Sequence, residues 1–574
     1  MTSGDVAFRK SDQAVPFALS TAMQGLYMLF PLLIECDATM FYSYAQFLAG
    51  KGGGLAAVRP PGFPAFLALT AVLPDSFTLT MVGHALMGIL MPVLIYRTLA
   101  PFNRPVAFGA ALVSIWSTLP YAAAKQLLAD QVFIFLLVAA MYSTSRVYWT
   151  RRTVHVYAAI LLSFAAWLTR WEGSVALIGT IVAVTVMMRP LRRHYWRVGG
   201  AVAIGLVVAV GWSFVRSQTL QDPRLFGSIS NGNGLQLMHK VYIDLPGQVM
   251  DWELNVLKTR TAGDTAGLIK SFFQPVGWYG VQVVAPENGP ASARFRRLME
   301  EEFANRPDIV RSAKPAMDGA YQDPNLPIDF YQEVFGKFDG RPAEMADNFF
   351  AQPNNFVLDY MWGRLGLQLG LAETDSLYRN VAIEALVQHP VAMALVLRDL
   401  LNFFHLELRG FLVEGTSPFL PLHMRANYFE TPFNIAGCAK DRLTPNMWQQ
   451  YVWDRQATDL PLARTLMAWG DFYGRNLVRA IMGPLALLIW WCLPWSRHRQ
   501  FFLYVPIVAL GMMGIMALAV GGGANTRYEG PTHPFMLVAT AGALITIIER
   551  LRPALRAPLP GAAAPGPTGV QAQP

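Results

Sequence analysis

The chain has 574 residues, of which 53% are hydrophobic and 15% are charged, and its mean hydropathy is +0.31. This composition excludes an average soluble protein and a single compact domain, and it predicts a polytopic membrane protein. The net charge of +8 does not indicate a nucleic-acid partner, because the basic residues stand in short clusters between apolar runs. The cysteines Cys36, Cys438 and Cys492 lack metal-site spacing and allow at most one disulfide, between Cys36 and Cys438.

The first part of the chain consists of apolar runs of roughly bilayer length. Residues 15–34 are uncharged, too long for the core of a signal peptide and without a convincing small-residue cleavage site, so we interpret them as a retained helix. Flanking Trp, Tyr and Arg residues extend the shorter runs into the membrane interface. We therefore predict seven spans, the other six at residues 76–96, 105–124, 131–145, 154–169, 173–188 and 198–215.

Arginines follow the second, fourth and sixth of these spans, whereas the other connections carry charges of both signs. Because cytoplasmic loops are enriched in Lys and Arg, we expect the arginine-rich connections to face the cytoplasm. The opposite face then carries Asp37 and Arg59, Asp130, and Arg170 with Glu172. The cytoplasmic arginines in this assignment are Arg97, Arg104, Arg146, Arg151, Arg152, Arg189, Arg192, Arg193 and Arg197.

A long polar stretch, residues 216–475, follows the seventh span and must lie outside. Apolar residues at helical spacing before Pro390 indicate that it is folded, and they are Tyr378, Val381, Ala382, Ala385 and Leu386. Three further spans are expected at residues 476–495, 501–520 and 531–548. The remaining tail is rich in Ala, Pro and Gly, which is typical of disorder.

The predicted fold class is therefore an all-α polytopic membrane protein with about ten transmembrane helices and a large extracytoplasmic domain that is mainly helical and irregular. The chain divides into an N-terminal transmembrane module that carries the catalytic residues (1–215), the extracytoplasmic domain (216–475), the C-terminal transmembrane helices (476–549) and a cytoplasmic disordered tail (550–574).

The stretch after the first span is the most informative part of the sequence. Asp37 stands where an uncharged run gives way to water, so its carboxylate is near the membrane yet reachable by polar substrates. Phe41, Tyr44, Ala45 and Leu48 recur at helical spacing, which predicts a helix along the membrane surface. Arg59 precedes Pro60 and Pro61, whose restricted backbones would hold it in a fixed approach to the next helix.

This pattern resembles the membrane glycosyltransferases of the GT-C fold, in particular the protein mannosyltransferase and aminoarabinose transferase group. Asp37, Tyr42, Ala45, Gly50, Arg59, Pro60 and Pro61 fill the places of that family's outer-loop motif. Arg527 and Tyr528, in N-T-R-Y-E-G-P-T-H-P, match the Arg-Tyr and Pro-x-x-Pro element that precedes the family's last helix. The resemblance covers the first seven spans and the last one, but it does not cover most of residues 216–475.

Glycosyl transfer from a lipid phosphate needs a base to activate the acceptor hydroxyl and cations to hold the departing phosphate. Asp37 is the candidate catalytic base. The resemblance implies direct attack by the acceptor with inversion, rather than a covalent intermediate on Asp37. Arg59, Arg170 and Arg527, the last with Tyr528, are the candidates for binding the donor phosphate. The alternative is that each arginine pairs with a nearby carboxylate, such as Glu529 or Glu172, or anchors a helix end.

Three further carboxylates are candidates for catalysis or acceptor binding. Asp130 and Glu172 open predicted helices, where a favourable interaction with the helix dipole and capping alone would explain them. Glu35 is expected to be structural or to tune the pKa of Asp37. A divalent metal ion at Asp37 and a second carboxylate is compatible with the fold, but the sequence establishes no cofactor. His84 has no partner at ligand spacing, so a packed helix histidine is the better interpretation.

The predicted function is transfer of a sugar from a polyprenyl-phosphate carrier to a lipid, glycan or protein acceptor. The predicted location is the bacterial inner membrane, with the site facing the periplasm. Two alternatives remain: a transporter or lipid flippase, for which repeat symmetry would be expected, and an enzyme like the O-antigen ligases or polymerases. The sequence names neither the sugar nor the acceptor.

Overall fold

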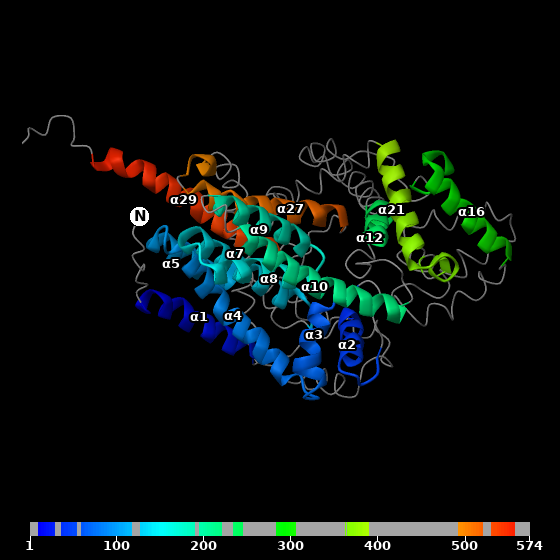
Figure 1. The fold of residues 1–574 in the computed structure, drawn as a ribbon, viewed down its shortest axis with the longest axis horizontal. Coiled ribbons are helices and arrows are strands. Elements are labelled where there is room, and N and C mark those ends of the chain that lie inside the picture. Colours follow the sequence, from blue (N-terminus) through cyan, green and yellow to red (C-terminus); the bar gives the residue numbers. More distant parts are fainter. Residues whose placement is uncertain are drawn as a thin grey trace, which may run out of the picture.

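The computed structural model describes residues 10–28, 36–53, 59–117, 127–189, 195–220, 233–244, 283–305, 362, 364–389, 492–496, 498–519 and 530–556. Helices make up 88% of these residues, and no strand occurs among them. The helical fold class is therefore confirmed for this part of the chain (Figure 1). Cys438, which could form at most one disulfide with Cys36, lies outside it, as do residues 476–491 of the predicted span 476–495.

Five helical segments of the described chain are long and apolar enough to cross a membrane. They include most of α4 (Thr78–Leu99), α7 (Asp130–Thr150), α10 (Tyr195–Leu220) and α29 (His533–Arg556), together with α26 (Arg499–Phe502) continued by α27 (Tyr504–Ala519). Four shorter apolar segments lie in α3 (Gly62–Leu67) with η1 (Ala68–Val72), in α5 (Arg104–Ser117), in α8 (Thr153–Thr169) and in α9 (Gly173–Met187). The structure thus supports five candidate spans where the sequence predicts about ten.

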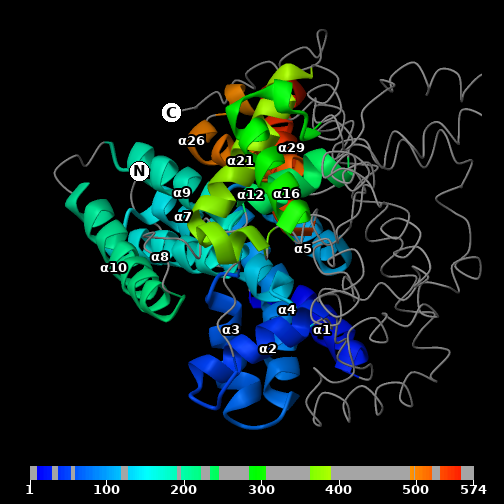
Figure 2. The ribbon, with the colours of Figure 1, turned by 90° about the vertical axis from the view of Figure 1, so that its right-hand side faces the viewer.

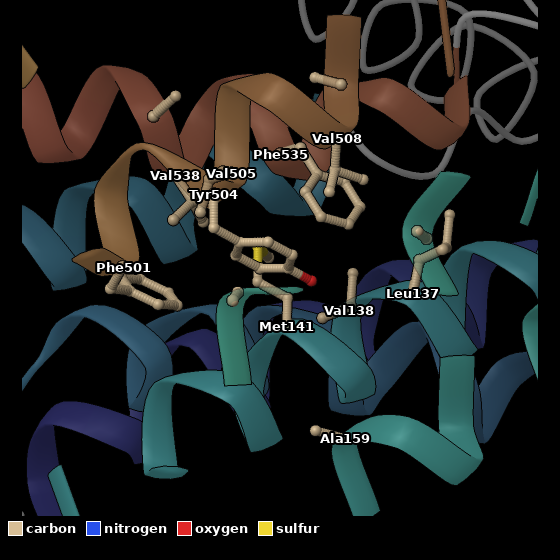
Figure 3. Packing of buried hydrophobic residues seen from close by; sticks show 14 of the residues in the cluster. Leu137, Val138, Met141, Ala159, Phe501, Tyr504, Val505, Val508, Phe535 and Val538 are labelled. Carbon is tan, nitrogen blue, oxygen red and sulfur yellow. The ribbon is translucent and has the colours of Figure 1, made fainter. Parts of the chain in front are cut away.

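Helix α7 lies at the centre of the bundle, beside α4, α8 and α9 (Figure 1). The C-terminal helices α27 and α29 close over it, so residues far apart in sequence share one apolar core. Figure 3 shows Leu137, Val138 and Met141 of α7 facing Tyr504 and Phe535. The tyrosine and phenylalanine rings lie 6.4 Å apart, between centroids. The N- and C-terminal helices therefore form one packed unit.

One end of this bundle collects the chain turns that carry basic residues. Phe102, in the α4–α5 turn, lies 4.9 Å from the ring of His498. The Tyr148 hydroxyl near the end of α7 is 3.0 Å from His498 Nδ1, and Glu549 of α29 is 3.7 Å from its Nε2. We call this the His498 end, and the opposite end, where α7 begins, the Asp130 end. The grouping brings together connections that the sequence assigns to one face of the membrane.

A smaller helical unit follows α10 in the chain and comprises α12 (Asn233–His239), η3 (Lys240–Asp244), η4 (Pro286–Asn288), α16 (Pro290–Asn305) and α21 (Leu371–Gln388). Figures 1 and 2 show α12, α16 and α21 toward the same end of the molecule as α2 and α3, on the opposite side. The Glu384 carboxylate accepts hydrogen bonds of 2.9 and 2.8 Å from the first amides of α16. The helix predicted before Pro390 is confirmed as α21. The five apolar residues that predicted it are all buried: Tyr378, Val381, Ala382, Ala385 and Leu386.

The start of α3 packs directly on the end of α8. A Cβ atom on Gly62 would lie 2.6 Å from Thr169 Oγ1 and 2.7 Å from the backbone oxygen of Leu168. These are distances that real Cβ atoms do not reach, and a backbone atom cannot rotate away. Glycine at this position therefore sets how closely the chain after Arg59 approaches α8.

We expect Gly62→Ala to destabilise the protein by about 1–3 kcal/mol, because the added methyl group must push α3 away from α8. Thermal unfolding in detergent checks this expectation. Gly109→Ala in α5 is the matched control, since nothing lies within 4 Å of its Cβ position. Alanine in a helix interior there should be neutral or stabilising by up to about 1 kcal/mol. Equal melting temperatures for the two variants would contradict the close approach.

Candidate functional site

Helix α2 (Cys36–Leu48) includes the helix that the sequence predicts from Phe41 onward, and it begins one residue before Asp37. Residues 37, 41 and 44 are spaced by four and three positions and lie along one side of this helix. Phe41 and Tyr44 are buried, as is Ala45. The side chain of Asp37 lies outside the described part of the structure, as does Glu35. Asp37 is therefore placed by its helix alone, one turn before Phe41.

Arg59 reaches this side of α2 from the following segment. Its guanidinium carbon lies 5.3 Å from the centroid of the Phe41 ring, a cation–π contact. The Phe41 ring in turn meets the edge of Phe63 in α3, with 5.1 Å between centroids. Pro60 and Pro61 are buried between these elements. Arg59 therefore contacts α2, the helix before it in the chain, one helical turn from Asp37.

Tyr42 and Tyr44 take different positions on α2. The Tyr42 ring packs 5.5 Å from Phe77, and burial together with the negative charge of Asp75 raises the pKa of its hydroxyl. Burial also raises the pKa of Tyr44 well above the usual tyrosine range, while Arg216 of α10 acts in the opposite direction. Both hydroxyls therefore stay protonated at neutral pH.

A buried ion triad joins the ends of three helices at the Asp130 end. Asp130 is the first residue of α7, Arg170 follows α8, and Glu172 precedes α9. Arg170 Nη1 donates to Asp130 Oδ1, and its Nη2 donates to Glu172 Oε1 over 2.7 Å. The exposed fractions are 1%, 9% and 3% respectively. Phe133 covers the guanidinium, 5.6 Å from its ring centroid to the guanidinium carbon.

This geometry decides between the interpretations of these residues. Glu172 is the N-cap residue of α9 but makes no side-chain cap hydrogen bond, so capping does not explain it. The predicted alternative, in which Arg170 pairs with Glu172, is observed, and Asp130 adds a second carboxylate. One guanidinium and two carboxylates carry a net negative charge when all are ionised. An incoming phosphate would have to displace a carboxylate from Arg170.

The triad lies next to the elements that carry Asp37 and Arg59. The close contact of Gly62 with Leu168 and Thr169 places the start of α3 beside Arg170. The residues just before and after Asp130, from Leu127 to Val132, share a core cluster with Phe41 and Tyr42 of α2. The structure therefore brings Arg59, Asp130, Arg170 and Glu172 to one end of the bundle, as the sequence predicts for one membrane face.

Two buried polar residues support this region from α4 and α7. Gln131 donates from Nε2 to the backbone oxygen of His84 over 3.0 Å. The His84 ring stacks on Phe66, 5.6 Å between centroids and nearly parallel. His84 is 1% exposed, in agreement with its interpretation as a packed histidine. Within the described ranges no group of three His, Cys, Asp or Glu side chains could hold a metal ion.

Arg527 and Tyr528 lie outside the described residues, so their predicted contact with a donor phosphate stays a prediction. The element that follows them, η8 (Gly530–Thr532), packs against α7 and α27. Thr532 and His533 are buried at this contact. Chain continuity therefore places Arg527 within three residues of an element that touches α7.

Arg216 is the residue that sequence reasoning missed. The predicted seventh span ends at residue 215, and the predicted outer domain begins at Arg216. In the structure α10 continues to Leu220, and Arg216 is 0% exposed. The signal in the sequence is its helical spacing from the small residues Gly205, Ala209 and Ser213.

Comparison with known proteins adds no assignment. The chain matches no protein-family model, and no curated protein is significantly similar to it.

The triad predicts an asymmetric response to mutation. Arg170→Ala leaves two buried carboxylates without their cation, so we expect a loss of about 3–5 kcal/mol. Asp130→Asn keeps the arginine paired with Glu172 and should cost clearly less. Thermal unfolding of the purified variants measures both losses.

The control is Arg294→Ala, which removes the ion pair with Glu373 between half-exposed side chains. An exposed pair contributes about 0–1 kcal/mol, so this variant should melt close to wild type. If Arg170→Ala melted no lower than Arg294→Ala, the triad would have no structural role.

Proposed function

We propose that this protein is a membrane glycosyltransferase that moves a sugar from a polyprenyl-phosphate carrier to a lipid, glycan or protein acceptor. Asp37 acts as the general base, and arginines hold the phosphate that leaves. The Asp130 end faces the periplasm of a bacterial inner membrane. The observation that carries the proposal is the approach of Arg59 to α2 one turn from Asp37.

Three features support it. The apolar helices of the described chain suit a membrane enzyme whose donor is a lipid. Arg59 comes from another segment and contacts Phe41, one turn after Asp37 on α2, and a reaction that needs a base and a phosphate ligand together would use such neighbours. The outer-loop motif that contains Asp37 and Arg59 resembles that of GT-C enzymes, a resemblance that favours direct attack by the acceptor with inversion.

The reaction follows from these roles. Asp37 accepts the proton of an acceptor hydroxyl as that oxygen forms a bond to the anomeric carbon. The bond between this carbon and the phosphate oxygen breaks, and the lipid phosphate departs with the electron pair. A guanidinium stabilises the phosphate charge by charge-assisted hydrogen bonds. The anomeric centre is inverted in this single displacement.

Asp37→Asn tests the base. Asparagine keeps the size of aspartate but cannot take a proton at neutral pH, so turnover of a polyprenyl-phosphate-linked sugar should fall by about 10²- to 10⁴-fold. The measurement is mass spectrometry of the released polyprenyl phosphate, with purified protein in nanodiscs and envelope glycolipids as acceptors.

Asp75→Asn is the matched control. Asp75 is an exposed carboxylate on the loop after η1, and it lies close enough to Tyr42 of α2 to act on its hydroxyl electrostatically. Its φ of 53° is tolerated by asparagine, so activity should stay near wild type. Near-wild-type turnover by a folded Asp37→Asn protein would rule out Asp37 as the general base.

The orientation has its own test, which needs no substrate. We expect Glu287→Cys, in η4, to react with a membrane-impermeant maleimide in spheroplasts, and Arg152→Cys, in the α7–α8 turn, to stay unlabelled until the membrane is permeabilised. A protein lacking its native cysteines serves as the background. The opposite labelling pattern would place the Asp130 end in the cytoplasm.

A further inference from the structure

Basic side chains gather at the turn between α7 and α8, at the His498 end of the bundle. Arg146 near the end of α7 and Arg152 just before α8 both lie close enough to the ring of His155 to act on it electrostatically. Arg151 and Arg152, which join the two helices, are exposed. We call these four residues the basic turn. Three guanidinium groups on one helical hairpin repel one another unless an anion lies among them.

The described carboxylates at this end of the bundle lie elsewhere. Asp12 accepts a hydrogen bond of 3.2 Å from the tyrosine near the end of α4, and Glu549 lies beside His498. Tyr148, which contacts His498, stands two residues after Arg146 and therefore lies on nearly the opposite side of α7. Within the described residues no ion pair joins the basic turn to a carboxylate, and the Arg146 Nε atom is buried without a hydrogen-bond partner.

The helix ends at the turn account for only one of these arginines. Arg151 is the C-cap residue of α7, where the helix dipole favours a cation. Arg152 is the N-cap residue of α8, and this helix has no side-chain cap hydrogen bond. An acceptor or an anion is the favoured group at that position. The uncapped amides of α8 therefore add positive potential to that of the arginines.

Exposed apolar side chains next to the basic turn place it at the level of a membrane interface. Trp149 is 36% exposed and Val154 is 64% exposed. Tryptophan is enriched where acyl chains meet head groups. The Trp149 ring is held by Phe102 and His498, at 5.1 and 5.6 Å between centroids. Arg146 stands about one helical turn before Trp149, on the membrane side of that level, where a cation is costly unless it extends toward water or meets an anion.

We propose that the basic turn binds the head group of an anionic phospholipid in the leaflet at the His498 end, mainly through Arg146 and Arg152. The phosphodiester oxygens of such a lipid can accept paired hydrogen bonds from a guanidinium and place a negative charge among the arginines. Its acyl chains can contact Trp149 and Val154, whereas a free anion offers these apolar side chains nothing. The site lies at the end of the bundle opposite Arg59 and is separate from the proposed donor site.

Thermal unfolding of the full chain in a neutral detergent tests the site, because a ligand that binds only the folded protein raises the melting temperature. The probe is phosphatidylglycerol. Phosphatidylcholine with the same acyl chains and inorganic phosphate are titrated in parallel. Wild type should bind phosphatidylglycerol at least about 10-fold more tightly than phosphatidylcholine, and inorganic phosphate should produce no comparable rise.

Two variants remove the cations that the proposal relies on. Arg152→Gln removes an exposed charge near the membrane surface and should weaken binding of phosphatidylglycerol by about 5-fold. Arg146→Gln removes charge-assisted hydrogen bonds from a less hydrated position and should weaken it by about 10- to 100-fold. The melting temperature of each variant without lipid reports whether it folds. If Arg146→Gln does not fold, Arg152→Gln decides the outcome.

Arg189→Gln is the matched control, because it removes an exposed arginine that follows α9 at the same end of the bundle. It should bind phosphatidylglycerol as wild type does. Equal losses in Arg189→Gln and Arg152→Gln would show a general attraction to a basic surface and overturn the site. Folded variants of Arg146 and Arg152 that bind as tightly as wild type would overturn it as well, and so would an equal rise in melting temperature with phosphatidylcholine or inorganic phosphate.

Discussion

The contact of one guanidinium with two carboxylates determines the arrangement of the Asp130 end. Arg170 follows α8 and holds Asp130 at the start of α7 and Glu172 at the start of α9. Attraction between charges is strong in this little-exposed region, but both carboxylates lose their hydration there, so the three residues depend on one another. Because α3 packs on α8 through Gly62, the positions of Arg59 and α2 depend on where the triad fixes the end of α8. The candidate site therefore rests on a contact that takes no part in the proposed chemistry.

Charge and polarity are distributed unevenly along the described bundle, in the way a membrane requires. Within α7 and α8, Ser143, Thr144 and Ser163 donate to backbone oxygens of the preceding turn. Hydroxyls join α8, α9 and α27 through Ser163, Thr180 and Tyr504, at 3.1 and 2.9 Å. Such groups satisfy one another without ionised partners. Within the described bundle, the Arg170 triad lies at one end, and at the other end His498 lies 3.7 Å from the carboxylate of Glu549.

Local sequence patterns predict most of the described helices but few of the contacts between them. The predicted run at residues 131–145 corresponds to α7, which extends to Thr150, past Arg146, the charged residue at which the uncharged run stops. The pairing of Arg170 with Glu172 was foreseeable from their separation of two residues. Its pairing with Asp130 was not, since 40 residues separate them and periodicity carries no information on such contacts. Arg216 was missed because hydropathy marks where an apolar run stops, not where the helix does.

Three arginines reach the Asp130 end from three segments, and their surroundings assign them different tasks. The net charge of the Arg170 triad is negative when its three members are ionised, so this group repels a phosphate. Arg216 is buried in α10, close enough to Tyr44 of α2 to act on its hydroxyl electrostatically. Arg59 contacts Phe41, which stands one helical turn after Asp37 on α2; in the proposed reaction its guanidinium would stabilise the negative charge that develops on the departing phosphate.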